Sequence, residues 1–388
     1  MPVIEILFLL SIFLILYSFI GYPLSLVILD RMFLRNKKEM NKSSINPKVS
    51  VIIAAHNEEG VIQQKLENLI SLNYPKELLE IIIASDNSVD RTNEITEKFI
   101  ASNPVYFIKL YKVNKRQGKT NAQNEAVKVA SGEIVVFSDA NAILDHDAII
   151  HLVSSFSSPD IIYVTGQLRY VNSLEHISSE AENRYWNFDL YMRRVESDLQ
   201  TITAGNGAIY AIRKIEYVDF DPIKSHDSAM PLYAGLNNKR AIYNEKAIAY
   251  EKAGETSKDE LKRKVRMSRE ILTSIYGSLR LLNVFKCKWF SYFYFGHRTL
   301  RYSLFILHIL AFITNTLLVD EYHLYTILFV LQCLFYLLAL AKGVFRIKHR
   351  LFYYPYYYCM TILAQLLGAI NQLTGRSKPF WEKAETTR

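Results

Sequence analysis

Long apolar runs occur towards both ends of the chain. Residues 3–29 form an almost unbroken apolar run that contains a single acid. At about 1.5 Å per residue in a helix, a run of this length crosses a hydrocarbon core of about 30 Å. Residues 303–319 and 324–341 are further runs of the same kind, and a short acidic connection joins them. The pattern therefore predicts three transmembrane helices.

Two more segments mix apolar and polar residues at the spacing of a helix. Residues 351–373 are apolar but begin with a run of tyrosines and contain Gln365, so they either span the membrane or lie at its interface. Residues 262–285 combine basic and apolar side chains, which is typical of an interfacial amphipathic helix and equally of an ordinary surface helix. Both alternatives stay open for each segment.

Between residues 46 and 260 the pattern changes to short apolar runs that alternate with amphipathic stretches. The apolar runs predict strands and the amphipathic stretches predict helices. The strands are expected at 47–55, 79–85, 105–110 and 134–138, and the helices at 58–72, 90–100 and 120–130. This rhythm predicts an α/β fold with a Rossmann-like, mostly parallel sheet and helices on both faces.

The composition favours one soluble domain attached to membrane segments. The 388 residues are 50% hydrophobic and 22% charged, which is too apolar for disorder and too charged for a chain that lies wholly in the membrane. Cys287, Cys333 and Cys359 show no C-x-x-C spacing, so neither a disulfide framework nor a zinc ribbon is expected. Much of the net charge of +8 sits beside the apolar runs, which favours membrane flanks over nucleic-acid binding.

The basic residues beside the apolar runs also predict an orientation. Arg31 and Arg35 follow the first run, Arg298 precedes the second and Lys342 follows the third, whereas the loop between the second and third runs is acidic. Because basic flanks stay on the cytoplasmic side, the N-terminus is expected outside and residues 31–300 in the cytosol.

Polar residues follow the predicted strands, at 56–59, 85–88 and 138–141. In an open parallel sheet, ligands bind outside the carboxyl ends of the strands. No G-x-G-x-x-G or G-x-x-x-x-G-K-[ST] loop follows the first strand, which disfavours a dinucleotide dehydrogenase and a P-loop enzyme. Asp139 and Asn141 place two oxygens on one turn, which suits Mg²⁺ or Mn²⁺. The alternative is an ordinary strand-to-helix loop, where both residue types are common.

An ordered series of motifs runs through this region. The first half contains AAHNEE (54–59), ASDNSVDRT (84–92), RQGKTNAQNEA (116–126) and EIVVFSDANA (133–142). The second contains GNGAIYAIRK (205–214), HDSAMPLYAGLNNKRAIY (226–243) and AIAYEKAGETSKDELKRKVRMSREI (247–271). The series resembles the membrane-bound family-2 glycosyltransferases, in the branch of cellulose, chitin and hyaluronan synthases. That resemblance implies a GT-A fold, a nucleotide-sugar donor and Mg²⁺ or Mn²⁺ as cofactor.

The resemblance also implies roles in the donor half. Asp86 resembles the acid that recognises the uracil and ribose side of the donor. Asp139 resembles the first acid of the family's D-x-D metal site, and Asn141 stands where many relatives have a second Asp, so the metal ligands would be Asp139 and Asn141. The other residues expected to bind the donor are Ala55, Asn57, Glu58 and Lys119.

In the acceptor half, Asp227 falls where the family places its general base, and His226 replaces the acid that precedes it. The family's Q-x-x-R-W motif appears as Arg263-Lys-Val-Arg266-Met267. Arg266, with Arg263, would therefore clamp the pyrophosphate, whereas the tryptophan that stacks on the acceptor is lost. The residues expected on the acceptor side are Gly205, Asn206, Gly207 and His226.

These roles imply an inverting, metal-dependent hexosyltransferase. It would move a sugar from a nucleotide-diphosphate donor, a UDP-sugar, to a hydroxyl acceptor during synthesis of an exopolysaccharide or a cell-surface glycan. An alternative is the transfer of a single sugar to a lipid acceptor, either a polyprenyl-linked glycan or a diacylglycerol. A non-catalytic membrane scaffold would not require Asp86, Asp139, Asp227 and Arg266 together.

The expected organisation follows from the runs and the motifs. We expect an integral protein of the plasma (inner) membrane, with the lipid bilayer as a partner, a cytosolic catalytic domain and no nucleic-acid partner. The expected parts are a transmembrane helix (1–30), a basic linker (31–46), a GT-A domain (47–260), amphipathic interface helices (261–300), a transmembrane region (301–375) and a basic tail (376–388).

Overall fold

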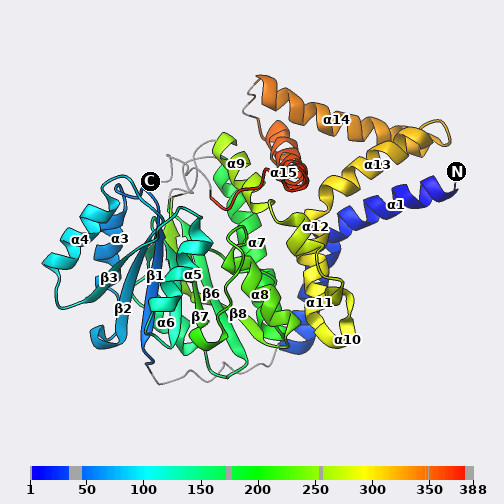
Figure 1. Ribbon diagram of the computed structural model, residues 1–388. Coiled ribbons are helices and arrows are strands. Elements are labelled where there is room, and N and C mark those ends of the chain that lie inside the picture. The colour runs from blue at the N-terminus through cyan, green and yellow to red at the C-terminus, as the bar shows by residue number, and fades with distance from the viewer. Residues whose placement is uncertain are drawn as a thin grey trace. The chain divides into compact units, whose positions relative to one another are not determined.

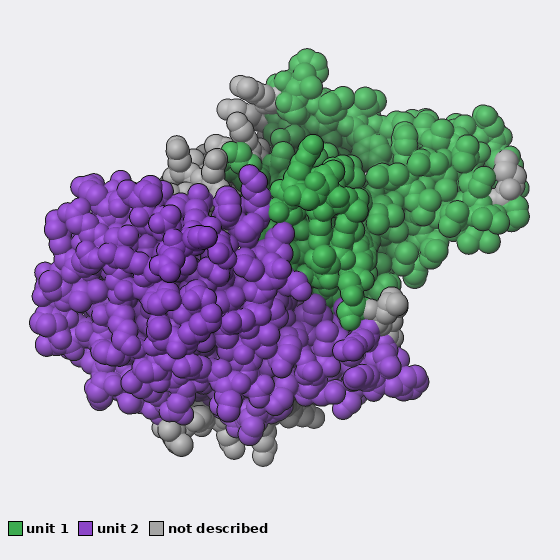
Figure 2. Space-filling model, in the orientation of Figure 1, with its two compact units in different colours: residues 1–28, 256–279, 292–377 green, residues 29–255, 280–291, 378–388 purple. Residues whose placement is uncertain are grey.

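The computed structural model describes residues 2–34, 46–171, 177–252, 257–345, 347 and 349–380. The chain forms two compact units, which Figure 2 colours separately. The first unit comprises residues 1–28, 256–279 and 292–377, and the second comprises residues 29–255, 280–291 and 378–388. Most of the predicted linker and tail lies outside the described residues, at 35–45 and 381–388.

A mixed sheet forms the centre of the second unit (Figure 1). Within the described residues its strand order is β3-β2-β1-β4-β7-β6-β8-β5. The strands are β1 (Val49–Ala55), β2 (Leu79–Ser85), β3 (Phe107–Lys112), β4 (Ile134–Asp139), β5 (Ile143–Leu144), β6 (Ile161–Tyr170), β7 (Ile209–Arg213) and β8 (Arg240–Glu251). The four strands expected from the sequence are β1 to β4, and all four are present.

Most pairs in this sheet are parallel, as predicted. β1 pairs in parallel with β2 and β4, β2 pairs in parallel with β3, and β6 pairs in parallel with β8. β7 runs antiparallel between β4 and β6, and the short β5 runs antiparallel to β8. The carboxyl ends of β1, β2 and β4 therefore lie at one edge of the sheet, where the polar motifs follow them.

Helices cover both faces of the sheet because its strands are apolar on both sides. In β1, Val51 and Ile53 pack with Leu66 in one hydrophobic cluster, whereas Ile52 packs with Ala122 in another. The helices of this unit are α3 (Ile62–Ile70), α4 (Thr92–Ser102), α5 (Lys119–Val129), α6 (Ala148–Ser154), α7 (Ile177–Leu199) and α8 (His226–Leu236). The sheet is thus buried between two layers, which explains the continuous apolar runs of its strands.

Two helices begin later than the sequence predicts because polar residues form turns before them. The carbonyl of Glu58 accepts hydrogen bonds from the amides of Val61 and Ile62, so residues 58–61 form a turn and α3 starts at Ile62. Asp90 accepts a hydrogen bond from the amide of Thr92 at 3.0 Å in the turn before the helix, and α4 starts at Thr92.

The first unit contains helices that are long and apolar enough to cross a membrane. Among the described residues, two helices qualify by length and composition: the segment Pro2–Leu34 and α14 (His323–Phe345). A third span is possible if Trp289–Tyr302 and α13 (Leu304–Leu318), which meet at a bend of 61°, act together. α15 (Arg350–Leu373) does not meet the same test, so its two alternatives stay open.

Several short elements complete the chain. The segment Pro2–Leu34 consists of α1 (Pro2–Leu16), η1 (Tyr17–Gly21), α2 (Tyr22–Leu29) and η2 (Asp30–Leu34). The remaining elements are η3 (Lys76–Leu78), η4 (Lys214–Glu216), α9 (Ser257–Met267), η5 (Ile271–Ile275), η6 (Leu279–Leu282), α10 (Val284–Cys287), α11 (Trp289–Phe293), η7 (Tyr294–Thr299) and α12 (Leu300–Tyr302). The region predicted as one amphipathic segment is therefore a series of short helices.

Candidate active site

Asp86 follows β2 directly and lies buried, with 3% of its surface exposed. Its two carboxylate oxygens accept hydrogen bonds from the amides of Gln117 and Gly118, at 3.0 and 2.8 Å. Its own amide donates to the carbonyl of Ala55 at the end of β1. Asp86 thereby joins the end of β1, the end of β2 and the loop before α5, which are the segments predicted to bind the donor.

The loops after β1 and β2 are held together by side chains. The amide of Asn57 donates to Ser88 at 3.1 Å, and the Asn57 side chain accepts from the amide of Val89 at 2.8 Å. The amide of Glu58 donates to the Thr92 hydroxyl at 2.7 Å. The structure therefore places Asn57 and Glu58 at the predicted edge of the sheet, where they give this part of the site its shape.

Asp139, Lys119 and Gly207 meet at the carboxyl end of β4. The Lys119 ammonium forms an ion pair with the Asp139 carboxylate and donates to the carbonyl of Gly207 at 3.4 Å. A methyl group added at Gly207 would lie 3.1 Å from the Lys119 nitrogen and 3.6 Å from an Asp139 oxygen. Both charged side chains are partly exposed, so this cluster is open to a charged ligand.

The oxygen ligands at this position fit a hard divalent cation that is bound together with phosphates. Asp139 supplies a carboxylate, and Asn141, two residues later, supplies an amide oxygen. The described residues contain no group of three or more His, Cys, Asp or Glu that could hold a metal by themselves. Mg²⁺ sites commonly use only one or two carboxylates and complete their shell with water and substrate phosphates. The Lys119 ammonium already shows that this carboxylate attracts positive charge.

Asp227 lies in the first turn of α8, close to the same cluster. Its carbonyl accepts a hydrogen bond from the amide of Gly205 at 2.7 Å. A side chain at Gly205 would overlap the Tyr163 hydroxyl, so only glycine fits there. Burial, together with the charges of Asp227 and, more weakly, Asp139, raises the pKa of Tyr210 well above its ordinary value. Both carboxylates therefore act on the same buried ring.

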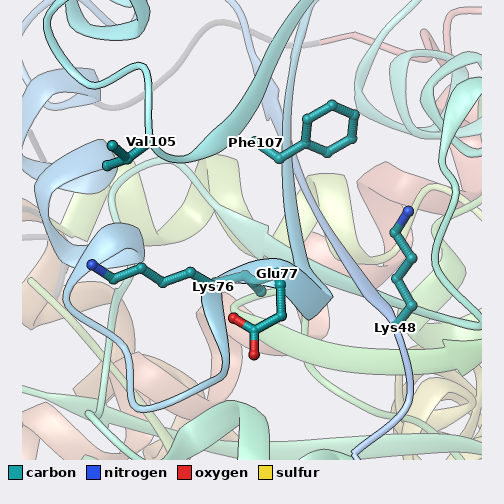
Figure 3. Close-up of a pocket in the computed structure, with 6 residues that line it drawn as sticks. Lys48, Lys76, Glu77, Val105 and Phe107 are labelled. Carbon is teal, nitrogen blue, oxygen red and sulfur yellow. The ribbon is translucent and has the colours of Figure 1, made fainter.

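A pocket at the opposite edge of the sheet lies away from these residues (Figure 3). Lys76 and Glu77 of η3 line it together with Val105, Phe107 and Lys48. Because β2 and β3 begin here, the pocket lies at the amino ends of the parallel strands, whereas ligands of such sheets bind at the carboxyl ends. We therefore place the candidate site at the Asp139 edge.

The comparisons with known proteins assign a family to this part of the chain. Residues 50–217 match the sequence family described as glycosyl transferase family 2. These residues form a family 2 glycosyltransferase domain. The match begins at the second residue of β1 and ends beyond β7, so it includes the Asp86 and Asp139 motifs.

Two curated relatives are bacterial glycosyltransferases. A probable glycosyltransferase, YdaM, from Bacillus subtilis is 38% identical over 131 residues, which cover 33% of this chain and 31% of the relative. A poly-beta-1,6-N-acetyl-D-glucosamine synthase from Staphylococcus epidermidis is 28% identical over 264 residues, which cover 66% of this chain and 63% of the relative. The chain thus spans less than two thirds of either relative.

One solved structure matches nearly the whole chain. It is the mannosyltransferase PcManGT from Pyrobaculum calidifontis in complex with GDP-Man and Mn²⁺. The match has a TM-score of 0.73 at 19% identity and covers 95% of this chain and 99% of that one. The likeness confirms the predicted GT-A fold of the glycosyltransferase domain, with apolar helices before and after it.

His226, which lies after the matched residues, is buried, with 1% of its surface exposed. Its nitrogens lie 2.9 Å from a Gln123 oxygen and 2.8 Å from the Tyr217 hydroxyl, and its ring stacks on Phe137. Burial and the nearby Lys119 charge lower the pKa of His226 to about 3, so the ring is neutral near pH 7. His226 therefore holds the start of α8 through buried contacts. Because its side chain is buried, we do not assign it a direct contact with the acceptor.

Asn206 also shapes the site through its own hydrogen bonds. Its side-chain nitrogen donates to the carbonyl of Gly166, and its oxygen accepts from the amides of Ala208 and Ile209 at 3.1 and 3.2 Å. These contacts use both ends of the amide to fold the loop between α7 and β7. Asn206 therefore determines where Gly205 and Gly207 lie.

Arg263 and Arg266 lie on α9, which belongs to the first unit. Arg263 forms two hydrogen bonds with the carboxylate of Glu260, at 2.7 and 2.8 Å. Lys264 approaches the same carboxylate at 3.4 Å. Glu260, which no sequence motif singled out, therefore accepts the hydrogen bonds of Arg263 in this structure.

Two features beside the site were not predicted from the sequence. Lys65 of α3 is fully buried. Its position three residues after Ile62, on the apolar face of the helix, could have predicted this burial from the sequence. The ring of Phe380 lies over the guanidinium of Arg116, with 4.8 Å to the ring centroid. No local pattern predicts this second contact because it joins residues far apart in the chain.

Proposed function

We propose that the protein is an inverting hexosyltransferase that moves a sugar from a UDP-sugar to a hydroxyl acceptor, in the synthesis of an exopolysaccharide or a cell-surface glycan. The observation that carries the proposal is the cluster of Lys119, Asp139 and Gly207 at the carboxyl end of β4, with Asp227 in the first turn of α8. Such a reaction requires a carboxylate that can accept the proton of the acceptor and a charged site that can bind a diphosphate.

In this proposal the chain's own residues divide the work. Asp86 binds the nucleoside end of the donor, beside Ala55, Asn57 and Glu58. Lys119 contributes positive charge to the diphosphate, and Arg266 with Arg263 adds charge as the diphosphate leaves, because charge-assisted hydrogen bonds stabilise developing negative charge.

Asp227 is the proposed general base. It accepts the proton of the acceptor hydroxyl while that oxygen attacks the anomeric carbon and the bond to the diphosphate breaks. A single displacement inverts the configuration, so no second carboxylate is needed as a nucleophile. Gly205, Asn206 and Gly207 form the proposed acceptor side, and the amide of Gly205 is hydrogen-bonded to the carbonyl of Asp227.

Asp139 and Asn141 are the proposed ligands of a divalent cation, Mg²⁺ or Mn²⁺. Such a cation would neutralise charge on the donor diphosphate. Removing divalent metal with EDTA is expected to abolish sugar transfer, and adding Mn²⁺ is expected to restore it. Full activity in EDTA would show that transfer does not depend on a divalent metal.

A second candidate function is the transfer of one sugar to a lipid acceptor. It is favoured by Met267, which stands where processive relatives carry the tryptophan that stacks on a growing polymer. The polysaccharide-synthase relative favours the first candidate instead. In both candidates the protein lies in the plasma (inner) membrane with its catalytic domain in the cytosol.

Purified protein in nanodiscs tests the proposal directly. Nucleoside diphosphate release is measured with UDP-N-acetylglucosamine, UDP-glucose and GDP-mannose, with Asp227→Asn as the control that should release little. Mass spectrometry of the product then separates a polymer from a single addition to lipid. Absence of release with every nucleotide sugar, in the presence of native lipids and Mn²⁺, would overturn the assignment as an active transferase.

A further inference from the structure

Lys65 is an unusual residue for the interior of a domain. It lies on α3, and none of its surface is exposed. Lysine is seldom buried completely, because removing an ammonium from water is unfavourable unless its hydrogen-bond donors are satisfied. The partners of its nitrogen are a hydroxyl and a backbone carbonyl. Burial lowers its pKa to about 7.

The contacts of Lys65 converge on the turn after β4. Its ammonium donates to the hydroxyl of Ser138 at 2.8 Å and to the carbonyl of Ala142. These two residues bracket Asp139 and Asn141 in the chain. One buried side chain therefore fixes both ends of the segment that carries the proposed metal ligands.

Ser138 extends this contact to the next loop. Because its hydroxyl accepts a hydrogen bond from Lys65, its own proton is directed to the carbonyl of Ala208, at 2.7 Å. Ala208 follows Gly207, whose carbonyl accepts a hydrogen bond from the Lys119 ammonium. The network thus connects α3 to both backbone segments that surround the Asp139 carboxylate.

We propose that Lys65 is a positioning residue of the cation and diphosphate site, and that its buried ammonium fixes the backbone of the Asp139–Asn141 turn against the Gly205–Ala208 loop. The proposal rests on the proposed function, because it assigns a support to the site named there. Lys65 itself does not touch the substrate. Groups behind metal ligands orient them, and losing such a group commonly weakens metal binding by about 10- to 100-fold.

The test measures Mn²⁺ binding as well as sugar transfer. Lys65→Met keeps the length of the side chain and removes its donors. Electron paramagnetic resonance then gives the Mn²⁺ dissociation constant of the full-length protein in nanodiscs, in the presence of UDP. We expect Lys65→Met to weaken Mn²⁺ binding at least about tenfold and to raise the donor KM, with thermal unfolding reported separately.

Lys214→Met is the matched control. Lys214 also donates to a backbone carbonyl, that of Ala130, but it follows β7 at the opposite end of that strand from Gly207. We expect its Mn²⁺ affinity to match the wild type. If Lys65→Met does not fold, Ser138→Ala decides instead, because it removes only the hydroxyl that links Lys65 to Ala208.

The outcomes separate this inference from the proposed function. If the wild type binds Mn²⁺ and UDP and the folded Lys65→Met or Ser138→Ala variant binds them equally well, Lys65 has no positioning role and the inference is overturned. If the wild type itself binds no Mn²⁺ in the presence of UDP, the metal-dependent function fails first, and the inference fails with it.

Discussion

Lys119 and Asp139 show how a charged site is maintained before a ligand binds. Each side chain satisfies the charge of the other, and both remain partly exposed. A diphosphate would replace Asp139 as the partner of Lys119, and a cation would replace Lys119 as the partner of Asp139. Each replacement would free the other side chain for its own ligand. The ion pair therefore leaves both charged side chains partly exposed to solvent rather than buried.

At the same scale, Asp227→Asn tests the proposed proton transfer. Asparagine keeps the shape of the residue but cannot accept the proton, so turnover should fall by roughly 10²–10⁴-fold. The Mn²⁺ and UDP affinities should stay close to those of the wild type. Steady-state rates and binding measurements check this, with Asp219→Asn as a control at an exposed acid. Turnover near that of the wild type would exclude Asp227 as the base.

At the scale of elements, two contacts hold segments of the site in place. The neutral His226 ring packs the start of α8 against Phe137 of β4. Gly118, at φ +96°, allows the loop before α5 to approach the carbonyl of Pro379, and its amide binds Asp86. Each contact depends on one residue, so each predicts a specific effect of substitution.

His226 should make the stability of the domain depend on pH. Its pKa is about 3 in the folded state and close to 6.5 when unfolded, so only the unfolded state binds the proton between these values. Stability should therefore fall as the pH drops below about 6.5, by roughly 1–3 kcal/mol down to pH 4.5. Thermal unfolding against pH checks this. The fall should be smaller in His226→Gln, and an equal fall in both proteins would contradict the explanation.

Gly118→Ala should weaken donor binding. The positive φ is unfavourable for alanine, and the new methyl group would lie 2.5 Å from the carbonyl oxygen of Pro379. We expect a loss of stability of about 1 kcal/mol or more and a higher donor KM. Gly60→Ala is the control, because a methyl group there contacts nothing within 4 Å. Equal effects of the two substitutions would show that the loop tolerates the change.

At the scale of the whole molecule, the order of apolar and charged segments predicts the topology. Basic residues follow the first apolar helix and follow α14, whereas Asp320 and Glu321 lie between α13 and α14. From the positive-inside rule we expect the glycosyltransferase domain to face the cytosol, where nucleotide sugars are made.

Cysteine labelling checks this orientation in intact cells. After Cys287, Cys333 and Cys359 are replaced, single cysteines are introduced at Asp320 and at Ile215, both of which are exposed. An impermeant thiol reagent should label the Asp320→Cys variant in intact cells and the Ile215→Cys variant only after lysis. Labelling of the Ile215→Cys variant before lysis would reverse the proposed topology.

The sequence by itself determined the features that depend on local pattern. Continuous apolar runs predicted β1 to β4, because strands buried on both faces need apolar side chains at every position. The same reasoning predicted the apolar helices Pro2–Leu34 and α14. The polar residues after the strands predicted where Asp86 and Asp139 lie, because the carboxyl ends of neighbouring parallel strands meet at one edge of a sheet.

Only the tertiary structure decided what depends on contacts between distant segments. The antiparallel place of β7 between β4 and β6, the burial of Lys65 under Ser138, and the stacking of Phe380 on Arg116 each join residues far apart in the chain. The acid at position 139 was visible in the sequence, but its pairing with Lys119 and the anchoring of its turn by Lys65 were not. The periodicity of the sequence predicts which face of an element is apolar. The segment that packs against that face depends on the packing of the whole domain.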